Sequence, residues 1–280
     1  MILFLILLFA GNGAGQVAAP PADYTAEDQV IFDRYLHAME TKKTLPLGEL
    51  VIETARFFLG TPYTVSTLEK EPEKLVVNLR EMDCTTFVET VITLARTVRE
   101  ADPSFESFCR NIQRVRYREG VIHDYTDRLH YFSDWIYENE RKGWVRDMTR
   151  TIGGKPYQPD ISFMSTHPES YPLLKSHPER LRVIREKERE ITERKANAFI
   201  PEASVTNSGE EMQNGDIVCF VTAIKGLDIS HVGFICRQDG ALHFIHASSA
   251  SRKVIVEPRP LHIYVENIRL TTGIMIVRPQ

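Results

Sequence analysis

Residues 83–98 read Asp-Cys-Thr-Thr-Phe-Val-Glu-Thr-Val-Ile-Thr-Leu-Ala-Arg-Thr-Val, and we expect this stretch to be the helix around which the fold is built. Asp83 and the threonines after Cys84 are residue types that cap the free amides at a helix start. Pro103 lies beyond the predicted end. Apolar residues follow the cap at helical spacing, at Phe87, Val88, Val91, Ile92, Ala95 and Val98. The sequence therefore predicts a helix that begins at residues 83–86, with Cys84 in its first turn.

The segments on either side of this helix differ in character. Upstream, residues 26–41 and 46–59 also carry apolar residues at helical spacing, and Gly60-Thr-Pro-Tyr63 ends the second of these predicted helices. Downstream of Phe199 come short β-rich runs separated by turn residues, namely 216–221, 231–236, 242–246, 253–256 and 274–277. Such runs indicate an antiparallel sheet. Helices first and strands last predict an α+β fold.

A long connection joins the central helix to these strands. Residues 104–146 are helical and aromatic in character, and residues 151–177 are punctuated by proline and glycine. Residues 178–195 alternate in charge sign, which is typical of a solvated helix face. We therefore expect one domain over residues 20–280, in which 104–198 is a helical insertion.

Composition excludes several classes of protein without indicating a reaction. The chain has 280 residues, 34 Lys and Arg, 38 Asp and Glu, and a net charge of −4. A length of roughly 150 residues per domain allows two domains or one elaborated domain. The apolar fraction of 42% excludes wholesale disorder. The mild acidity argues against a surface built to bind nucleic acid.

Motifs for cofactors are missing from the sequence. Gly153-Gly-Lys lacks the strand–loop–helix context of a phosphate-binding loop, and no CxxC or HExxH spacing supports zinc. We therefore expect no nucleotide, no metal and no other cofactor.

The first residues read as a targeting segment. Residues 1–10 form an uninterrupted apolar run, too short to span a hydrocarbon core of ~30 Å, and Val17-Ala18-Ala19 offers a small-x-small cleavage site. A basic region before the run is missing, because the first Lys or Arg is Arg34. We expect residues 1–19 to be a signal peptide, so the mature protein is exported, to the periplasm of a bacterium, and has no membrane span. The other interpretation is a buried N-terminal strand.

Three residues form a candidate catalytic group. Free amides and the helix dipole at a helix start favour an anion, which is one way in which the pKa of a cysteine falls. We therefore expect a lowered pKa at Cys84. His231 begins one predicted strand and His246 ends the next, so a hairpin would bring two imidazoles together. His231 could then act as a general base, and His246 could fix its tautomer.

The remaining cysteines fit a structural role. Cys109, Cys219 and Cys236 lie inside apolar runs, as small buried residues do. A disulfide between Cys219 and Cys236 remains open after export.

Five motifs in order resemble the NlpC-type cell-wall hydrolases, which are papain-like cysteine peptidases. Asp83-Cys-Thr-Thr-Phe-Val88 resembles their nucleophile motif, and Gly60-Thr-Pro-Tyr63 resembles a segment that precedes it. Asn214-Gly-Asp-Ile-Val-Cys-Phe220 is similar to a strand of that family. Ser230-His-Val-Gly-Phe234 matches the strand with the base, and Phe244-Ile-His-Ala-Ser-Ser249 matches the strand with the third catalytic residue. The resemblance implies a papain-like core of N-terminal helices, nucleophile helix and antiparallel sheet.

The long insertion departs from compact members and resembles one branch of that superfamily. Met82–Thr90 and the insertion sequences 116–125 and 127–136 are similar to the exported N-acetylmuramoyl-L-alanine amidase-like proteins. The branch implies a hydrolase that cuts the amide bond between N-acetylmuramic acid and L-alanine in peptidoglycan fragments (muropeptides). Cys84, His231 and His246 would be catalytic, and the backbone amide of Cys84 would help to bind the oxyanion.

Substrate contacts are expected from residues near the nucleophile and in the insertion. Tyr63 and Asp83 adjoin Cys84 in the matched motifs, and Tyr63 could donate a hydrogen bond. Arg128 suits a carboxylate and Trp135 suits a sugar face. Leu129, Phe132 and Ile136 have the helical spacing of core residues.

Other functions remain open. The chain could be a D-glutamyl–diamino-acid endopeptidase of the same superfamily, an acyl transferase of transglutaminase type, or a wall-binding module without catalysis. Protein partners and oligomeric state are not indicated by the sequence.

Overall fold

The computed structural model describes residues 21–194, 197–206 and 209–280, and the expected signal peptide at 1–19 lies outside this part of the chain. The helices are α1 (Ala26–Met39), α2 (Leu47–Phe57), α3 (Cys84–Thr97), α4 (Phe105–Arg116), α5 (Phe132–Arg141), α6 (Phe163–Thr166), α7 (Pro172–Lys175), α8 (Pro178–Glu193) and α9 (Leu261–Asn267). The strands are β1 (Ala22–Asp23), β2 (Leu75–Val76), β3 (Val145–Asp147), β4 (Lys155–Pro156), β5 (Ala198–Pro201), β6 (Ile217–Thr222), β7 (Ile229–Gln238), β8 (Ala241–Ser248), β9 (Lys253–Val256) and β10 (Thr271–Pro279).

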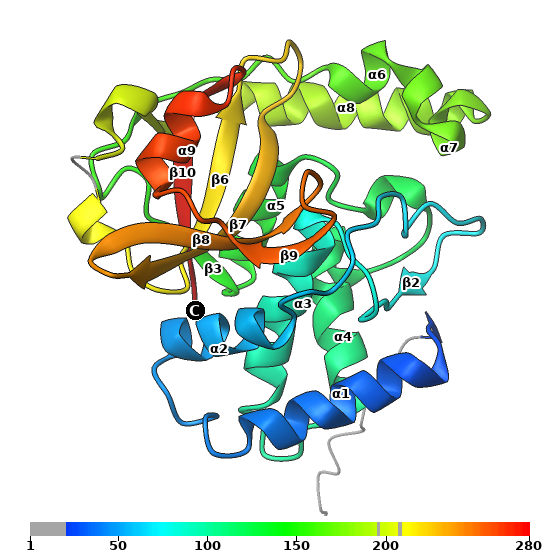
Figure 1. The fold of residues 1–280 in the computed structure, drawn as a ribbon. Helices are drawn as coiled ribbons and strands as arrows, with labels where there is room; N and C mark the ends of the chain where they lie inside the picture. The colour runs from blue at the N-terminus through cyan, green and yellow to red at the C-terminus, as the bar shows by residue number, and fades with distance from the viewer. Residues whose placement is uncertain (1–20, 195–196, 207–208) are drawn as a thin grey trace, which may run out of the picture.

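A mixed α and β architecture is confirmed. The main sheet has the order β4-β5-β10-β6-β7-β8-β9, with β3 also paired to β10, and its pairs are antiparallel (Figure 1). The five predicted strands are β6 to β10. Strands β1 to β5 were not predicted, because their two to four residues carry too little periodicity to read. The seven-residue helix α9 was not predicted either.

Both faces of the sheet are buried, as strand β6 illustrates. Ile217, Cys219 and Val221 belong to the core that the sheet shares with α1 to α5. Val218 and Phe220 point to the opposite face and pack with residues of α9. Because successive side chains of a strand alternate between faces, a run that is buried on both sides has to be apolar throughout.

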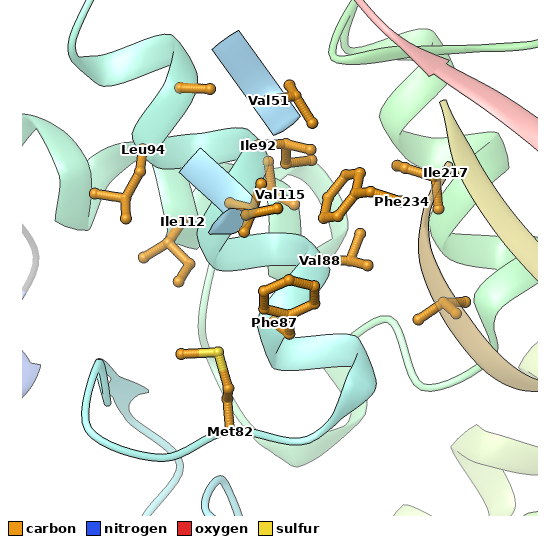
Figure 2. Close-up of a cluster of buried hydrophobic side chains, with 14 of the residues drawn as sticks. Val51, Met82, Phe87, Val88, Ile92, Leu94, Ile112, Val115, Ile217 and Phe234 are labelled. Carbon is orange, nitrogen blue, oxygen red and sulfur yellow. The ribbon is translucent and has the colours of Figure 1, made fainter. Parts of the chain in front are cut away.

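Helix α3 lies at the centre of the larger core. Figure 2 shows Phe87 and Val88 of α3 among side chains of α2, α4 and the sheet, including Val51, Ile112 and Phe234. The rings of Phe87 and Phe234 meet edge to face, with centroids 5.7 Å apart. This packing fixes the start of α3, and with it Cys84, against strand β7.

The segment expected as one insertion packs in two places. Helices α4 and α5 belong to the main core, where Phe108 and Trp135 are fully buried. Helices α6 to α8 share a smaller cluster, which includes Met164, Leu174 and Ile184. Figure 1 places α8 at the end of the molecule opposite to α1 and α2. The first half of the segment therefore packs against helix α3, whereas the second half forms a separate layer.

Two kinds of feature are absent from the described residues. None of their helices is both long and apolar enough to cross a membrane. Within the same ranges, no group of three or more His, Cys, Asp and Glu side chains could hold a metal ion.

Candidate active site

Cys84 occupies the first position of α3, and a reciprocal cap holds it there. The Asp83 carboxylate accepts the amide of Thr86 at 2.8 Å, and the Thr86 hydroxyl accepts the amide of Asp83 at 2.9 Å. The predicted cap is confirmed. The amide of Cys84 itself has no intrahelical acceptor at this position, so it is available to a ligand.

The Gly60–Tyr63 segment links the residues before Cys84 to the edge strand β9. The amide of Gly60 donates to Val254 of β9, and the amide of Met82 donates to Pro62. Tyr63 forms a bridge with Met82, two residues before the nucleophile. Burial and the neighbouring Cys84 raise the pKa of Tyr63 to about 12, so its hydroxyl is a donor at neutral pH.

Strands β7 and β8 bring His231 and His246 together. The Nε2 atom of His231 lies 2.6 Å from Nδ1 of His246, so the two imidazoles share a hydrogen bond. The β7–β8 register, continued by one residue, sets Gly233 opposite His246. A Cβ at Gly233 would lie 3.0 Å from the Cβ of His246 and 2.8 Å from the carbonyl oxygen of Ile245. The glycine therefore leaves the space that His246 occupies.

Aromatic rings enclose this histidine pair on the α9 face of the sheet. Phe220 stacks on His231, with centroids 5.7 Å apart, and Phe244 and Tyr264 pack on His246. Burial lowers the pKa of His231 to about 3 and that of His246 to about 4. Both imidazoles are therefore neutral at physiological pH, and Nδ1 of His231 remains for a proton transfer.

The pKa of Cys84 differs from the sequence-based expectation. Burial of its sulfur, together with the adjacent Asp83 carboxylate, raises the pKa of Cys84 to about 12. Amides of Thr85 and Val232 act in the opposite direction and are outweighed. The expectation of a lowered pKa was wrong, because it considered the helix start and neglected the cost of removing a thiolate from water. The resting pair is therefore a neutral thiol and a neutral imidazole.

Cys84 and His231 line one cavity of about 70 Å³. Three parts of the chain line it: the start of α3, the segment that leads into α5, and the β6–β7 turn with the start of β7. The lining residues are Cys84, Thr85, Leu129, His130, Phe132, Leu227, Asp228, Ile229, Ser230, His231 and Val232. The cavity is open to a small acyl group, and its wall includes residues from the 104–198 segment.

Two polar residues of this wall are His130, which belongs to the insertion where substrate contacts were expected, and Asp228, to which the sequence assigned no role. The Asp228 carboxylate accepts the amide of Ser133 at 2.7 Å, which ties the β6–β7 turn to α5. His130 Nε2 lies 2.9 Å from the carbonyl oxygen of Tyr125, so Nε2 carries the hydrogen and Nδ1 is an acceptor. Burial lowers the pKa of His130 to about 3, which keeps the ring neutral. No local motif distinguished Asp228.

Trp135 is not part of this site. Its side chain is fully buried, stacks on Phe132 with centroids 4.7 Å apart, and donates from Nε1 to Glu89 at 3.3 Å. It has no exposed face on which a sugar could stack. The expected role as a substrate contact is corrected to that of a core residue beneath α3.

Arg128 is near the site, but its charge is already matched. It lines a second cavity of about 250 Å³ together with Asp83 and Tyr171. Its guanidinium donates to Glu73 from Nε at 3.2 Å and from Nη2 at 2.9 Å, and to Glu69 from Nη1 at 2.8 Å. The carboxylates that we expected from the substrate are therefore supplied by the protein.

Glu257 and Tyr264 lie behind the histidine pair and were not predicted from the sequence. The Oε2 atom of Glu257 is 3.5 Å from Nε2 of His246, and Arg259 donates to Oε1 of the same carboxylate. Tyr264 of α9 packs against His246. The usable signal was the position of Glu257, directly after a strand that pairs with the strand of His246.

The other cysteines play no part in the site. Cys109, Cys219 and Cys236 are buried, and all four cysteines of the described chain are free thiols. Cys219 pairs with Val232 and Cys236 pairs with His243 in the sheet register, so the disulfide that the sequence left open is not formed.

Comparisons with known proteins place this site in context. A family model described as AmiA-like, N-acetylmuramoyl-L-alanine amidase-like, matches residues 53–274. An N-acetylmuramoyl-L-alanine amidase from Bacteroides uniformis is similar in structure, with a TM-score of 0.80 and 34% identity, over 84% of this chain and 99% of that one. A Bacteroides fragilis protein named as a candidate xylanase has 36% identity and a TM-score of 0.74, over 80% of this chain and 99% of that one. A Legionella pneumophila protein, LPG0564, shares the fold at 21% identity and a TM-score of 0.68, over 90% and 94% of the two chains. No curated protein matches.

Proposed function

The chain belongs to the N-acetylmuramoyl-L-alanine amidase-like family, and on that premise we propose that it is a cysteine amidase of the NlpC-type, papain-like superfamily. Its substrate is the amide bond between N-acetylmuramic acid and L-alanine in muropeptides. The observation that carries the proposal is the shared cavity of Cys84 and His231, with His231 hydrogen-bonded to His246 behind it. Nucleophile, base and orienting group are the three parts that acyl transfer requires.

The reaction begins from the neutral pair. The Cys84 sulfur attacks the lactyl carbonyl carbon while its proton moves to Nδ1 of His231. The amide of Cys84, free at the helix start, donates to the developing oxyanion. His231 then gives the proton to the nitrogen of L-alanine as the carbon–nitrogen bond breaks, which releases the peptide and leaves a thioester.

Water completes the cycle. His231, neutral again, takes a proton from water as the water oxygen attacks the thioester carbonyl. The carbon–sulfur bond breaks, the proton returns to Cys84, and the free lactyl carboxylate of the sugar leaves. Because the resting thiol is protonated, base and nucleophile have to act in one concerted step.

The location of the protein is part of the proposal. We place it outside the cytoplasm, in the periplasm, on the basis of the apolar N-terminal run. The small cavity around Cys84 favours soluble muropeptides over intact polymer, which fits the recycling of wall fragments. Similar rates on sacculi and on purified muropeptides would contradict that preference.

Defined muropeptides test the reaction. The intact chain and Cys84→Ala are incubated with a disaccharide pentapeptide, and the products are identified by mass spectrometry. We expect free disaccharide and a peptide that begins with L-alanine, and neither product with Cys84→Ala. Turnover by Cys84→Ala would refute the cysteine mechanism. Cleavage after D-glutamate would show an endopeptidase of the same superfamily instead.

A further inference from the structure

The hydrogen bond between the two histidines can point in either direction, and only one direction supports catalysis. If Nε2 of His231 donates, its Nδ1 carries a lone pair and can take the proton of Cys84. If Nδ1 of His246 donates, the neutral His231 carries its hydrogen on Nδ1 and cannot act as a base. The 2.6 Å separation is compatible with both arrangements. Something beyond the pair has to select the productive one.

Glu257 is placed to make that selection. Nε2 of His246 is buried and has no hydrogen-bond partner in standard geometry among the described residues, and Oε2 of Glu257 lies 3.5 Å from it. A carboxylate accepts and does not donate, so it favours a hydrogen on Nε2 of His246. Nδ1 of His246 is then the acceptor, and His231 has to donate from Nε2. A contact that is long in the free enzyme can shorten when the neighbouring imidazole becomes charged.

Arg259 determines which oxygen of the Glu257 carboxylate faces His246. Its Nε donates to Oε1 of Glu257 at 2.5 Å, and its backbone amide reaches the same oxygen at 3.3 Å. Oε2 is thus left for the histidine. The Arg259 guanidinium stacks on Tyr264 at 4.8 Å, and His243 Nδ1 donates to the Glu257 carbonyl at 2.9 Å. The glutamate is therefore held from both its side chain and its backbone.

We propose that Glu257 is a positioning residue for the reaction proposed above, on which this inference rests. It sets the tautomer of His246, and through it makes Nδ1 of His231 the basic nitrogen. When His231 takes up the thiol proton, the positive charge is shared along the chain of hydrogen bonds toward the carboxylate. The groups that face this chain are Cys84, Tyr264 and Arg259, and Glu257 is its acidic end.

Glu257→Gln tests the proposal because an amide has one acceptor oxygen and one donor nitrogen. Arg259 requires the acceptor, so the amide nitrogen turns toward His246 and forces its hydrogen from Nε2 to Nδ1. His231 is then forced to carry its hydrogen on Nδ1. We expect kcat on the muropeptide to fall on the order of 10²-fold with KM unchanged, the size typical of a lost general base. Glu257→Asp, which keeps two acceptor oxygens, should restore part of kcat.

The direct readout is the tautomer state, measured by ¹⁵N nuclear magnetic resonance of histidine-labelled protein. His231→Gln and His246→Gln spectra identify the two signals among the nine histidines. We expect hydrogen on Nε2 of both rings in the native chain and on Nδ1 of both in Glu257→Gln. Glu266→Gln, the same change at an exposed residue of α9, should alter neither spectrum nor kcat.

The outcomes separate the two proposals. A native His246 with its hydrogen on Nδ1, or unchanged tautomers in Glu257→Gln, overturns the role of Glu257. The native spectrum decides this even if the variant does not fold. A native chain that leaves muropeptides intact refutes the amidase function, while the tautomer measurement still decides whether Glu257 orders the protons.

Discussion

The buried ion pair between Glu89 and Arg116 holds the nucleophile helix, and breaking it should cost much of the protein's stability. Glu89 of α3 accepts from Nε of Arg116 at 2.7 Å, and both side chains are at most 3% exposed. Arg116 also donates to the carbonyl of Val76 at 2.6 Å, and Trp135 donates to Glu89. The pair thus joins α3 to α4, α5 and the strand β2.

Glu89→Gln leaves a buried guanidinium without its counter-charge. Such a change typically costs about 3–5 kcal/mol, against a total stability of about 5–15 kcal/mol for a typical domain. Arg116→Met should cost a similar amount, because it leaves the buried Glu89 carboxylate without its counter-charge. The double variant contains neither charge. Its loss of stability then comes from two polar groups without partners, the Val76 carbonyl and the amide introduced at position 89, at about 1–3 kcal/mol each. At the middle of these ranges the two single losses sum to about 8 kcal/mol and the double loss is about 4 kcal/mol, so the coupling energy should be about 4 kcal/mol.

Urea unfolding of the four proteins, followed by circular dichroism, measures the free energies that this cycle requires. Glu193→Gln is the control, because Glu193 lies in an exposed pair with Arg189 whose side chains are both 70% exposed. Its unfolding midpoint should not change. If the double variant loses the sum of the two single losses to within about 0.5 kcal/mol, the pair is not coupled and the reasoning fails.

Three further predictions concern the site. Activity (kcat/KM) should fall as the pH drops through about 3 to 4, because the histidine pair then takes up a proton and His231 can no longer act as a base. Around neutral pH these histidines should cause no change in kcat/KM. Alkylation of Cys84 by iodoacetamide should quicken about tenfold per pH unit between about pH 6 and about pH 10, because its pKa is raised to about 12; a rate independent of pH would show a resting thiolate instead. Gly233→Ala should displace His246, since the new methyl group meets its Cβ at 3.0 Å, and should lower kcat about tenfold and stability by about 1–3 kcal/mol. Gly209→Ala, where only the tip of Leu242 is near, is the control, and equal activity in both variants would contradict the steric argument.

The sequence by itself determined the features that depend on neighbours along the chain. Cys84 follows a capping residue and precedes an apolar stripe, so its place at the start of α3 could be read directly. The short β-rich runs of β6 to β8, separated by turn residues, likewise predicted a sheet, and the hairpin predicted that His231 and His246 meet. Each of these conclusions rests on local composition, on periodicity or on a cap, which act over a few residues.

Only the tertiary structure decided the properties that arise from burial and from distant segments. The pKa of Cys84 was misjudged because desolvation by surrounding segments outweighs the helix start. Trp135 and Arg128 have the residue types of substrate contacts, yet packing places one in the core and pairs the other with Glu69 and Glu73. Glu257 was overlooked because its position directly after β9 points to His246 only once β9 is known to pair with the strand of His246. Solvation and ion pairing depend on what surrounds a group in space, and the order of residues along the chain does not contain that information.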